Sequence, residues 1–133
     1  MSRDRSRRAR GDARDEREPS SFLPLPSATF HILLALRSGE KHGYAVMQDV
    51  EDLSEGLVKL GPGTLYGAVK RLLADGLIQE SDERPVPELD DQRRRYYRLT
   101  AVGESVCSAE VERLAKLLRN ALPSSFLREL GRA

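Results

Sequence analysis

The segment from Gly61 to Ile78 restricts the fold more than any other part of the sequence. Its apolar residues recur at about 100° per residue, which predicts a helix that packs one face on a core. This stripe consists of Leu65, Val69, Leu72 and Leu73. Pro62 suits the first helical turn, because its missing N–H would have no partner there, and Asp75-Gly76 supplies a stop. The sequence therefore predicts a helix over 62–74.

The opposite face of this predicted helix combines small residues with cations. Small side chains let a helix approach a groove of duplex DNA closely, and hydroxyl and cationic groups can contact phosphates or base edges. The candidate DNA-binding residues of the helix are Gly63, Thr64, Tyr66, Gly67, Lys70 and Arg71. Tyr66 lies at the edge of the apolar stripe and could serve either face. From this segment alone, an amphipathic helix with a solvated basic face is an equally good interpretation.

Two further helices are predicted upstream of this segment. Residues 27–37 are apolar enough for a largely buried helix, with Ser27 or Thr29 available as its cap. A second short helix begins near His42-Gly43 and presents one apolar face through Val50. A short link then leads to the predicted helix at 62–74, so the expected order is helix, helix, turn, helix.

The period of the sequence changes after Gly76. Residues 77–80 and 96–100 have the composition of strands, and the polar stretch between them contains Pro85 and Pro87. Two strands around a polar loop predict a β-hairpin. Three helices followed by such a hairpin form a winged helix-turn-helix, in which the third helix enters the major groove. Three further candidate DNA-binding residues stand where the wing returns from its tip: Arg93, Arg94 and Arg95.

Five short motifs resemble, in order, the pattern of the PadR-like family of transcriptional regulators. They are Lys41-His42-Gly43-Tyr44, Leu60-Gly61-Pro62-Gly63-Thr64-Leu65-Tyr66, Lys70-Arg71-Leu72, Asp75-Gly76-Leu77-Ile78 and Tyr96-Tyr97-Arg98-Leu99-Thr100. The resemblance covers about residues 23–122. It implies a dimeric repressor that contacts double-stranded DNA through Thr64, Tyr66 and Lys70 and through basic residues of the wing.

Two departures from the family pattern concern function. Gly67 stands where many relatives have proline, which makes this face of the helix smaller and more flexible. Some relatives stack flat aromatic drugs between tryptophans at the dimer interface, and this chain contains no tryptophan. Ligand sensing by that route is therefore not expected.

A long final helix, predicted over 101–122, carries the case for a homodimer. Its apolar residues recur every three or four positions, as in a helix that packs on another helix. The resemblance pairs it with the first helix of the partner across a two-fold axis, while packing within the same chain is the alternative. The expected cleft, which could also take a small-molecule effector, is lined by Phe30, His31, Leu34, Val111, Leu114 and Leu118. Two-fold symmetry predicts recognition helices about 34 Å apart and a pseudo-palindromic operator.

The expected fold class is mainly α with a small β-hairpin (α+β). The chain of 133 residues divides into a charged, disordered arm at 1–21, a DNA-binding domain at 22–100, the dimerisation helix at 101–122 and a tail at 123–133. The arm could instead contact DNA through its arginines. A net charge of +1 neither supports nor excludes nucleic-acid binding.

Several classes of function are not expected. Cys107 is the single cysteine, which excludes an intrachain disulfide and fits a packing role better than redox sensing. His31 and His42 lack neighbours at metal-ligand spacing, and no phosphate-binding loop or catalytic group is recognisable. We expect no metal, no cofactor, no enzymatic activity, no membrane segment and a cytoplasmic location. Two function classes remain: an operator-binding repressor, and a winged-helix module that controls transcription through protein contacts.

Overall fold

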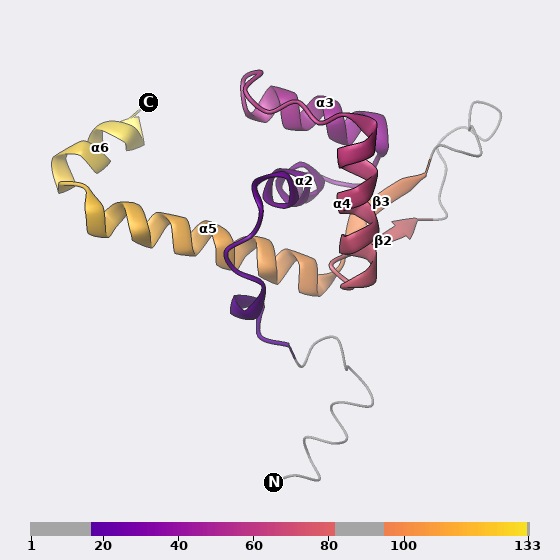
Figure 1. The fold of residues 1–133 in the computed structure, drawn as a ribbon. Coiled ribbons are helices and arrows are strands. Elements are labelled where there is room, and N and C mark those ends of the chain that lie inside the picture. The colour runs from indigo at the N-terminus through magenta and orange to yellow at the C-terminus, as the bar shows by residue number, and fades with distance from the viewer. Residues whose placement is uncertain (1–16, 82–94, 133) are drawn as a thin grey trace, which may run out of the picture.

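The computed structural model of the chain describes residues 17–81 and 95–132. A short 3₁₀ helix, η2 (Pro19–Phe22), precedes the helical domain shown in Figure 1. The other elements, in chain order, are α2 (Ser27–Arg37), β1 (Lys41–His42), α3 (Gly43–Leu53), α4 (Pro62–Ala74), β2 (Ile78–Ser81), β3 (Tyr96–Leu99), α5 (Ala101–Ala121) and α6 (Ser124–Arg132).

Helices α2, α3 and α4 enclose the core, as their apolar stripes predicted. The fully buried side chains include Ile32 and Leu33 of α2, Val46 of α3 and Leu65 of α4. One detail of the prediction was wrong. Pro26 is the N-cap of α2 and no side chain caps this end, because Thr29 lies two residues inside the helix and is buried.

The predicted β-hairpin is present, and a third strand completes the sheet. β2 pairs antiparallel with β3, with Ile78 opposite Leu99. β1 pairs with the other edge of β3, with Lys41 opposite Tyr97, so the strand order is β1-β3-β2. The sequence did not reveal β1, because two residues are too few to show an alternating pattern.

Helix α5 begins against the end of α4. The Thr100 hydroxyl caps α5 by accepting a hydrogen bond from the Gly103 N–H (3.0 Å), and it donates to the Gly76 carbonyl (2.6 Å). A Cβ atom at Gly103 would lie 1.9 Å from the Leu77 carbonyl oxygen. Only glycine therefore allows the first turn of α5 to approach this closely.

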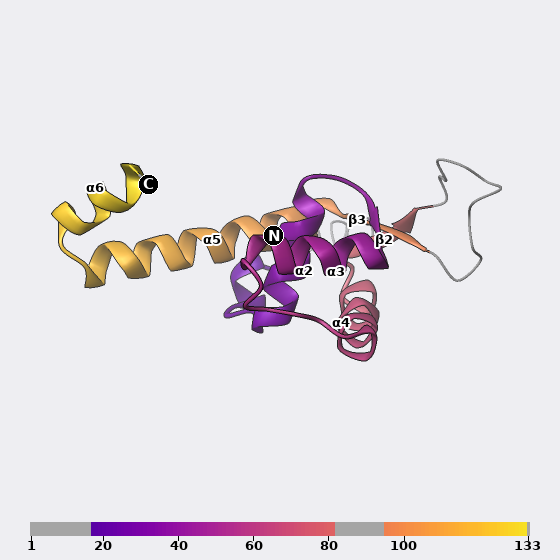
Figure 2. The ribbon, with the colours of Figure 1, turned by 90° about the horizontal axis from the view of Figure 1, so that it is seen from above.

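The first half of α5 packs inside its own chain, with Val106 and Cys107 fully buried against the core that includes α2. The alternative of intrachain packing therefore holds for this half. The second half extends beyond the domain (Figures 1 and 2), and Leu117 and Leu118 there remain about half exposed. The predicted apolar seam is thus divided between two environments.

A buried ion pair ties the N-terminal segment to α5. Glu110 is 2% exposed, and its carboxylate accepts hydrogen bonds from the Leu25 N–H (2.9 Å) and from the Arg113 Nε (2.5 Å). The hydrogen bond from Arg113 is the main cause of a lowered pKa for Glu110; burial opposes it, and the Leu25 N–H adds to it. The segment before α2 is therefore held to the middle of α5.

The residues expected as a tail contain the amphipathic helix α6, whose side chains are all at least partly exposed. Within the described residues, no helix combines the length and the apolar composition that a membrane crossing requires.

Candidate nucleic-acid interface

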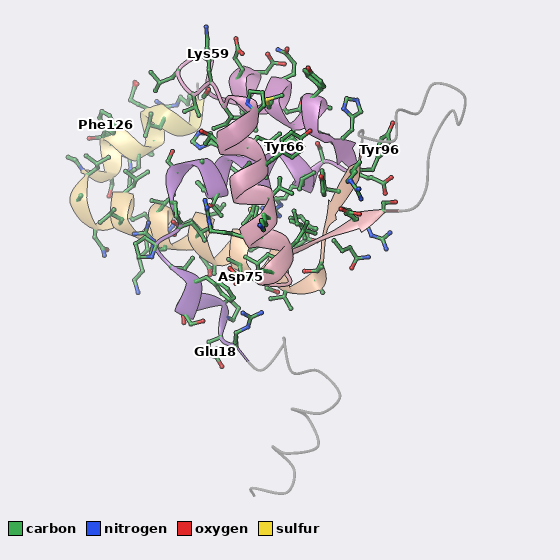
Figure 3. The ribbon with its side chains drawn as sticks, turned by 45° about the vertical axis from the view of Figure 1, so that its right-hand side comes forward. Glu18, Lys59, Tyr66, Asp75, Tyr96 and Phe126 are labelled. Atoms are coloured by element: carbon green, nitrogen blue, oxygen red, sulfur yellow. The ribbon has the colours of Figure 1, made fainter. Side chains whose placement is uncertain are left out.

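The outward face of α4 is the central part of the candidate interface. In Figure 3 the helix runs across the front of the domain, with Tyr66 midway along it and Asp75 at its C-terminal end. Gly63, Thr64, Lys70 and Arg71 are all exposed, whereas Gly67 is half-buried. The structure therefore brings the six candidate residues of α4 to one surface or its edge.

Tyr66 lies between this surface and α3. Its side chain is 40% exposed, and a Cβ atom at Gly43 would lie 2.2 Å from its hydroxyl oxygen. The ring therefore covers Gly43, at the start of α3, while one edge stays accessible. Tyr66 serves both faces of α4, the two roles that its position at the edge of the apolar stripe left open.

The cations of α4 are available for a ligand. Lys70 and Arg71 have no ion-pair partner among residues 17–81 and 95–132. Exposed cations without carboxylate neighbours create a positive potential that attracts phosphate. Lys59 is also exposed just before the N-terminus of α4 (Figure 3) and extends the basic surface in that direction.

Of the three predicted wing arginines, Arg95 lies within the described residues. Arg95 forms an ion pair with Glu80 on the neighbouring strand, with 3.2 Å between Nη1 and Oε1. Because both side chains are substantially exposed, this pair is weak and can exchange for a phosphate contact. Arg93 and Arg94 lie outside the described residues.

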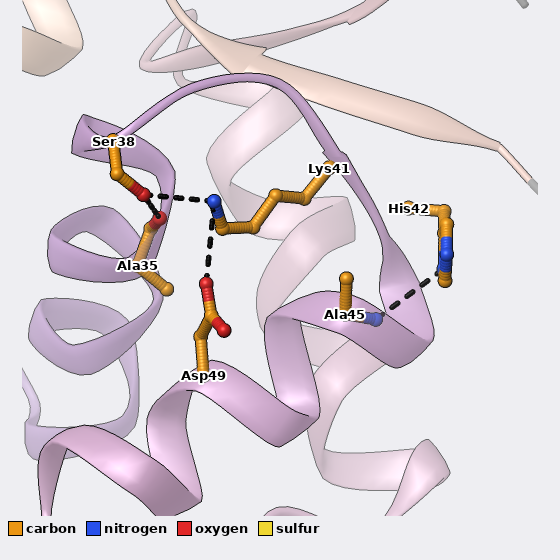
Figure 4. Close-up of polar contacts among 6 residues, drawn as sticks. All are labelled: Ala35, Ser38, Lys41, His42, Ala45 and Asp49. Atoms are coloured by element: carbon orange, nitrogen blue, oxygen red, sulfur yellow. Dashed lines mark hydrogen bonds and ion pairs between the residues drawn. The ribbon is translucent and has the colours of Figure 1, made fainter. Parts of the chain in front are cut away.

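Polar contacts fix α3 relative to α2 (Figure 4). The Lys41 ammonium donates to the Ser38 hydroxyl (2.8 Å) and lies 3.2 Å from an Asp49 carboxylate oxygen. The His42 Nδ1 accepts the Ala45 N–H (3.3 Å) and so caps α3. Lys41 and His42 thus have structural roles in positioning the helix that supports α4.

Two further exposed residues, one on α3 and one on β3, were not among the predicted contacts. Tyr44 is 68% exposed in the first turn of α3, next to the Gly43 that Tyr66 covers. Arg98 is exposed on β3. An aromatic residue at a polar helix start and a cation at an outward strand position were the sequence signals that could have identified them.

The residues of the expected cleft come from α2 and α5, which pack against each other. Phe30, His31, Leu34 and Leu114 are half-buried, and Val111 and Leu118 are exposed. The His31 Nδ1 lies 2.7 Å from the Ser27 carbonyl oxygen, and the His31 ring meets Phe30 edge to face. Within one copy of the chain these residues therefore form an open surface.

The described residues give little support for metal binding or for a reactive thiol. Within the described part of the chain, no three His, Cys, Asp or Glu side chains are grouped so as to hold a metal ion. Burial raises the pKa of the Cys107 thiol, which disfavours the reactive thiolate.

Sequence comparison places the chain among known regulators. A profile of the Transcriptional regulator PadR-like family matches residues 32–109. The Transcriptional regulator Rv3488 of Mycobacterium tuberculosis is 37% identical over 92 residues, which are 69% of this chain and 79% of the relative. An uncharacterised 37.1 kDa protein in transposon TN4556 of Streptomyces fradiae is 36% identical over 86 residues. That match covers 65% of this chain and only 22% of the length of the relative.

Solved structures show the same fold. RosR of H. salinarum is similar with a TM-score of 0.61 at 23% identity, over 84% of this chain and 90% of that one. Bacillus subtilis PadR in complex with operator DNA has a TM-score of 0.55 at 20% identity, over 65% of this chain and 47% of that one. The matched family consists of transcriptional regulators and not of enzymes. This chain belongs to the PadR-like family of transcriptional regulators.

Proposed function

We propose that the chain is a homodimeric repressor that binds a pseudo-palindromic operator through α4. The observation that carries this proposal is the exposed face of α4, where Lys70 and Arg71 lie beside Gly63 and Thr64 without an ion-pair partner among the described residues. Bacillus subtilis PadR, which has a similar fold, was solved in complex with operator DNA, and this supports DNA binding by the chain. The small residues let the helix backbone approach base edges, and the two cations bind flanking phosphates.

The exposed half of α5 supports the homodimer. Val111, Leu117 and Leu118 are at least 39% exposed on a helix that extends past its own domain. A second copy related by a two-fold axis would cover this apolar surface and place two α4 helices about one turn of duplex apart. Both half-sites would then be read by the same residues.

An effector could act on this arrangement by binding between α2 and α5. A ligand that prefers one spacing of the two α4 helices would shift the dimer toward or away from operator binding. The residues involved would be Phe30, His31 and Leu34 of α2 with Val111, Leu114 and Leu118 of α5. Changes in amide-exchange protection of α2 and α5 on ligand addition would identify such an effector, and unchanged protection with each candidate ligand would contradict this route.

Salt dependence of operator binding tests the proposal. Each neutralised phosphate contributes about −0.9 to the slope of log K against log salt concentration, and a dimer presents each contact twice. Lys70→Ala is therefore expected to weaken binding and to reduce the slope by about 2. Arg37→Ala is the control, since Arg37 is an exposed cation at the C-terminal end of α2, away from α4 and from the exposed half of α5.

The probe is DNA from the promoter region of the chain's own gene, titrated by fluorescence anisotropy at several salt concentrations. Equal slopes and affinities for Lys70→Ala and the unmodified protein would refute DNA binding through α4. If neither protein bound this DNA, the other function class, a winged-helix module that acts through protein contacts, would be favoured.

A further inference from the structure

Helix α6 presents an apolar face that nothing in the described chain covers. Phe126 is 48% exposed and Leu130 is 50% exposed, and no residue of α6 is buried. A helix of nine residues is marginally stable in water by itself, and most helices of this length depend on packing of an apolar face. The apolar face of α6 therefore needs a second surface to cover it.

The chain's own core cannot provide this surface. α5 is a continuous helix of 21 residues, about 32 Å long, and α6 follows its far end. Figures 1 and 2 show α6 separated from the helical domain in both views, beyond the half of α5 that carries exposed leucines. A straight α5 holds α6 away from the core of the same copy.

A matching groove lies between α2 and α3. It has a volume of about 350 Å³, and its apolar lining consists of Leu34, Ala35 and Leu53. Leu53, at the end of α3, is 57% exposed and gives the groove an accessible apolar wall. Asp49 and Asp52 stand at the rim, and Asp49 already pairs with Lys41 (3.2 Å; Figure 4).

We propose that α6 of one copy docks into the α2–α3 groove of a second copy. The apolar residues Phe126 and Leu130 would fill the groove and cover Leu53. Charge is complementary as well: Arg132 pairs with Glu129 within α6 and Asp49 pairs with Lys41, which leaves Arg128 of α6 to face Asp52 of the groove. The inference rests on the proposed homodimer and specifies a contact in addition to the α5 surface.

The geometry of a two-fold dimer allows this contact. In Figure 1, α6 lies on the same side of α5 as α2 and α3. A two-fold axis perpendicular to α5, near its exposed half, keeps that side common to both copies and brings the groove of the second copy toward α6. The same operation creates the contact twice, once for each α6.

The area that a stable dimer requires also favours docking of α6. A stable interface buries about 800 Å² per partner and involves about 20–30 residues a side. The exposed half of α5 extends only from Val111 to Ala121. α6 adds its apolar face to the α5 surface, and the groove adds Leu34 and Leu53 on the other side.

Intermolecular cross-linking tests the contact directly. Cys107 is the chain's single cysteine and is fully buried, so engineered cysteines react against a clean background. Full-length Leu53→Cys and Leu130→Cys proteins are mixed, allowed to exchange subunits and treated with a short bismaleimide. Leu57→Cys mixed with Leu130→Cys is the matched control, because Leu57 is 88% exposed and does not line the groove.

We expect the Leu53→Cys and Leu130→Cys mixture to give at least fivefold more covalent dimer than the control mixture or either variant alone. Equal yields, or no covalent dimer while sedimentation shows dimers, would overturn the docking of α6 and leave the homodimer intact. Monomers in sedimentation for every variant and for the unmodified protein would overturn the homodimer itself. As a second measurement, Phe126→Ala should weaken dimerisation at least fivefold, and an unchanged dissociation constant would contradict the proposal.

Discussion

Replacement of Gly103 by alanine separates local helix propensity from tertiary packing, because the two predict opposite signs. In a helix alanine is favoured over glycine by up to about 1 kcal/mol, so propensity alone predicts a more stable protein. The structure predicts the reverse. The new Cβ atom would lie 1.9 Å from the Leu77 carbonyl oxygen, and this neighbour is backbone, which cannot rotate away.

The expected loss of stability follows from the shift that the start of α5 must make. To relieve the clash, the start of α5 must shift from Leu77, which strains the hydrogen bonds from the Thr100 N–H to the Leu77 carbonyl (3.0 Å) and from the Thr100 hydroxyl to the Gly76 carbonyl (2.6 Å). Overpacking costs about 1–3 kcal/mol and each hydrogen bond is worth about 1 kcal/mol. After the gain in propensity, we expect a net destabilisation of about 2–4 kcal/mol.

Gly67→Ala is the matched control, since the nearest atom to its new Cβ is the Arg71 Nη1 at 4.0 Å. This substitution should stabilise the protein by about 0.5–1 kcal/mol. Urea unfolding followed by circular dichroism measures both changes, at one fixed protein concentration because the proposed dimerisation would add to apparent stability. A Gly103→Ala protein as stable as the unmodified one would refute the packing argument.

Three further predictions concern buried groups of α5. Glu110→Ala leaves the Leu25 N–H without its acceptor, and urea unfolding should show a loss of about 1–3 kcal/mol in the free energy of unfolding. The loss stays in this range because Arg113, whose side chain is 39% exposed, can turn to solvent. Since the folded pKa of Glu110 is lowered, its stabilising effect is complete above the unfolded pKa of about 4.3 and is lost as pH falls through the folded pKa. The unmodified protein and Glu110→Gln should therefore converge in stability on acidification. A difference in stability that stays constant with pH would contradict this account. Cys107, buried and with a raised pKa, should react with iodoacetamide only after unfolding, and rapid labelling of the native protein would show that the thiol is accessible.

The sequence predicted the helices well because their signals are local. The stripe of Leu65, Val69 and Leu72 and the Pro62 start specify α4 without reference to any other segment. The hairpin was also predictable, since strand-forming residues flank a polar loop. The two residues of β1 became a strand only because β3 offers them a free edge, which no local pattern reveals.

The candidate site divides in the same way. Amino-acid type and spacing were sufficient to place Thr64, Lys70 and Arg71 on one exposed face of α4. They were not sufficient to show that Tyr66 covers Gly43 or that Arg95 pairs with Glu80, because these contacts join elements far apart in the chain.

By itself, the sequence determined the helical order of this protein, the apolar faces and the basic surface of α4, because each follows from residues within a few turns of one another. Only the tertiary structure decided which half of α5 is buried, that Gly103 must lack a side chain and that Glu110 holds the Leu25 N–H. These features depend on the distance between surfaces that meet only after folding. The periodicity of α5 continues through Leu118, but the core ends near Glu110, and the remaining apolar surface stays exposed in a single copy.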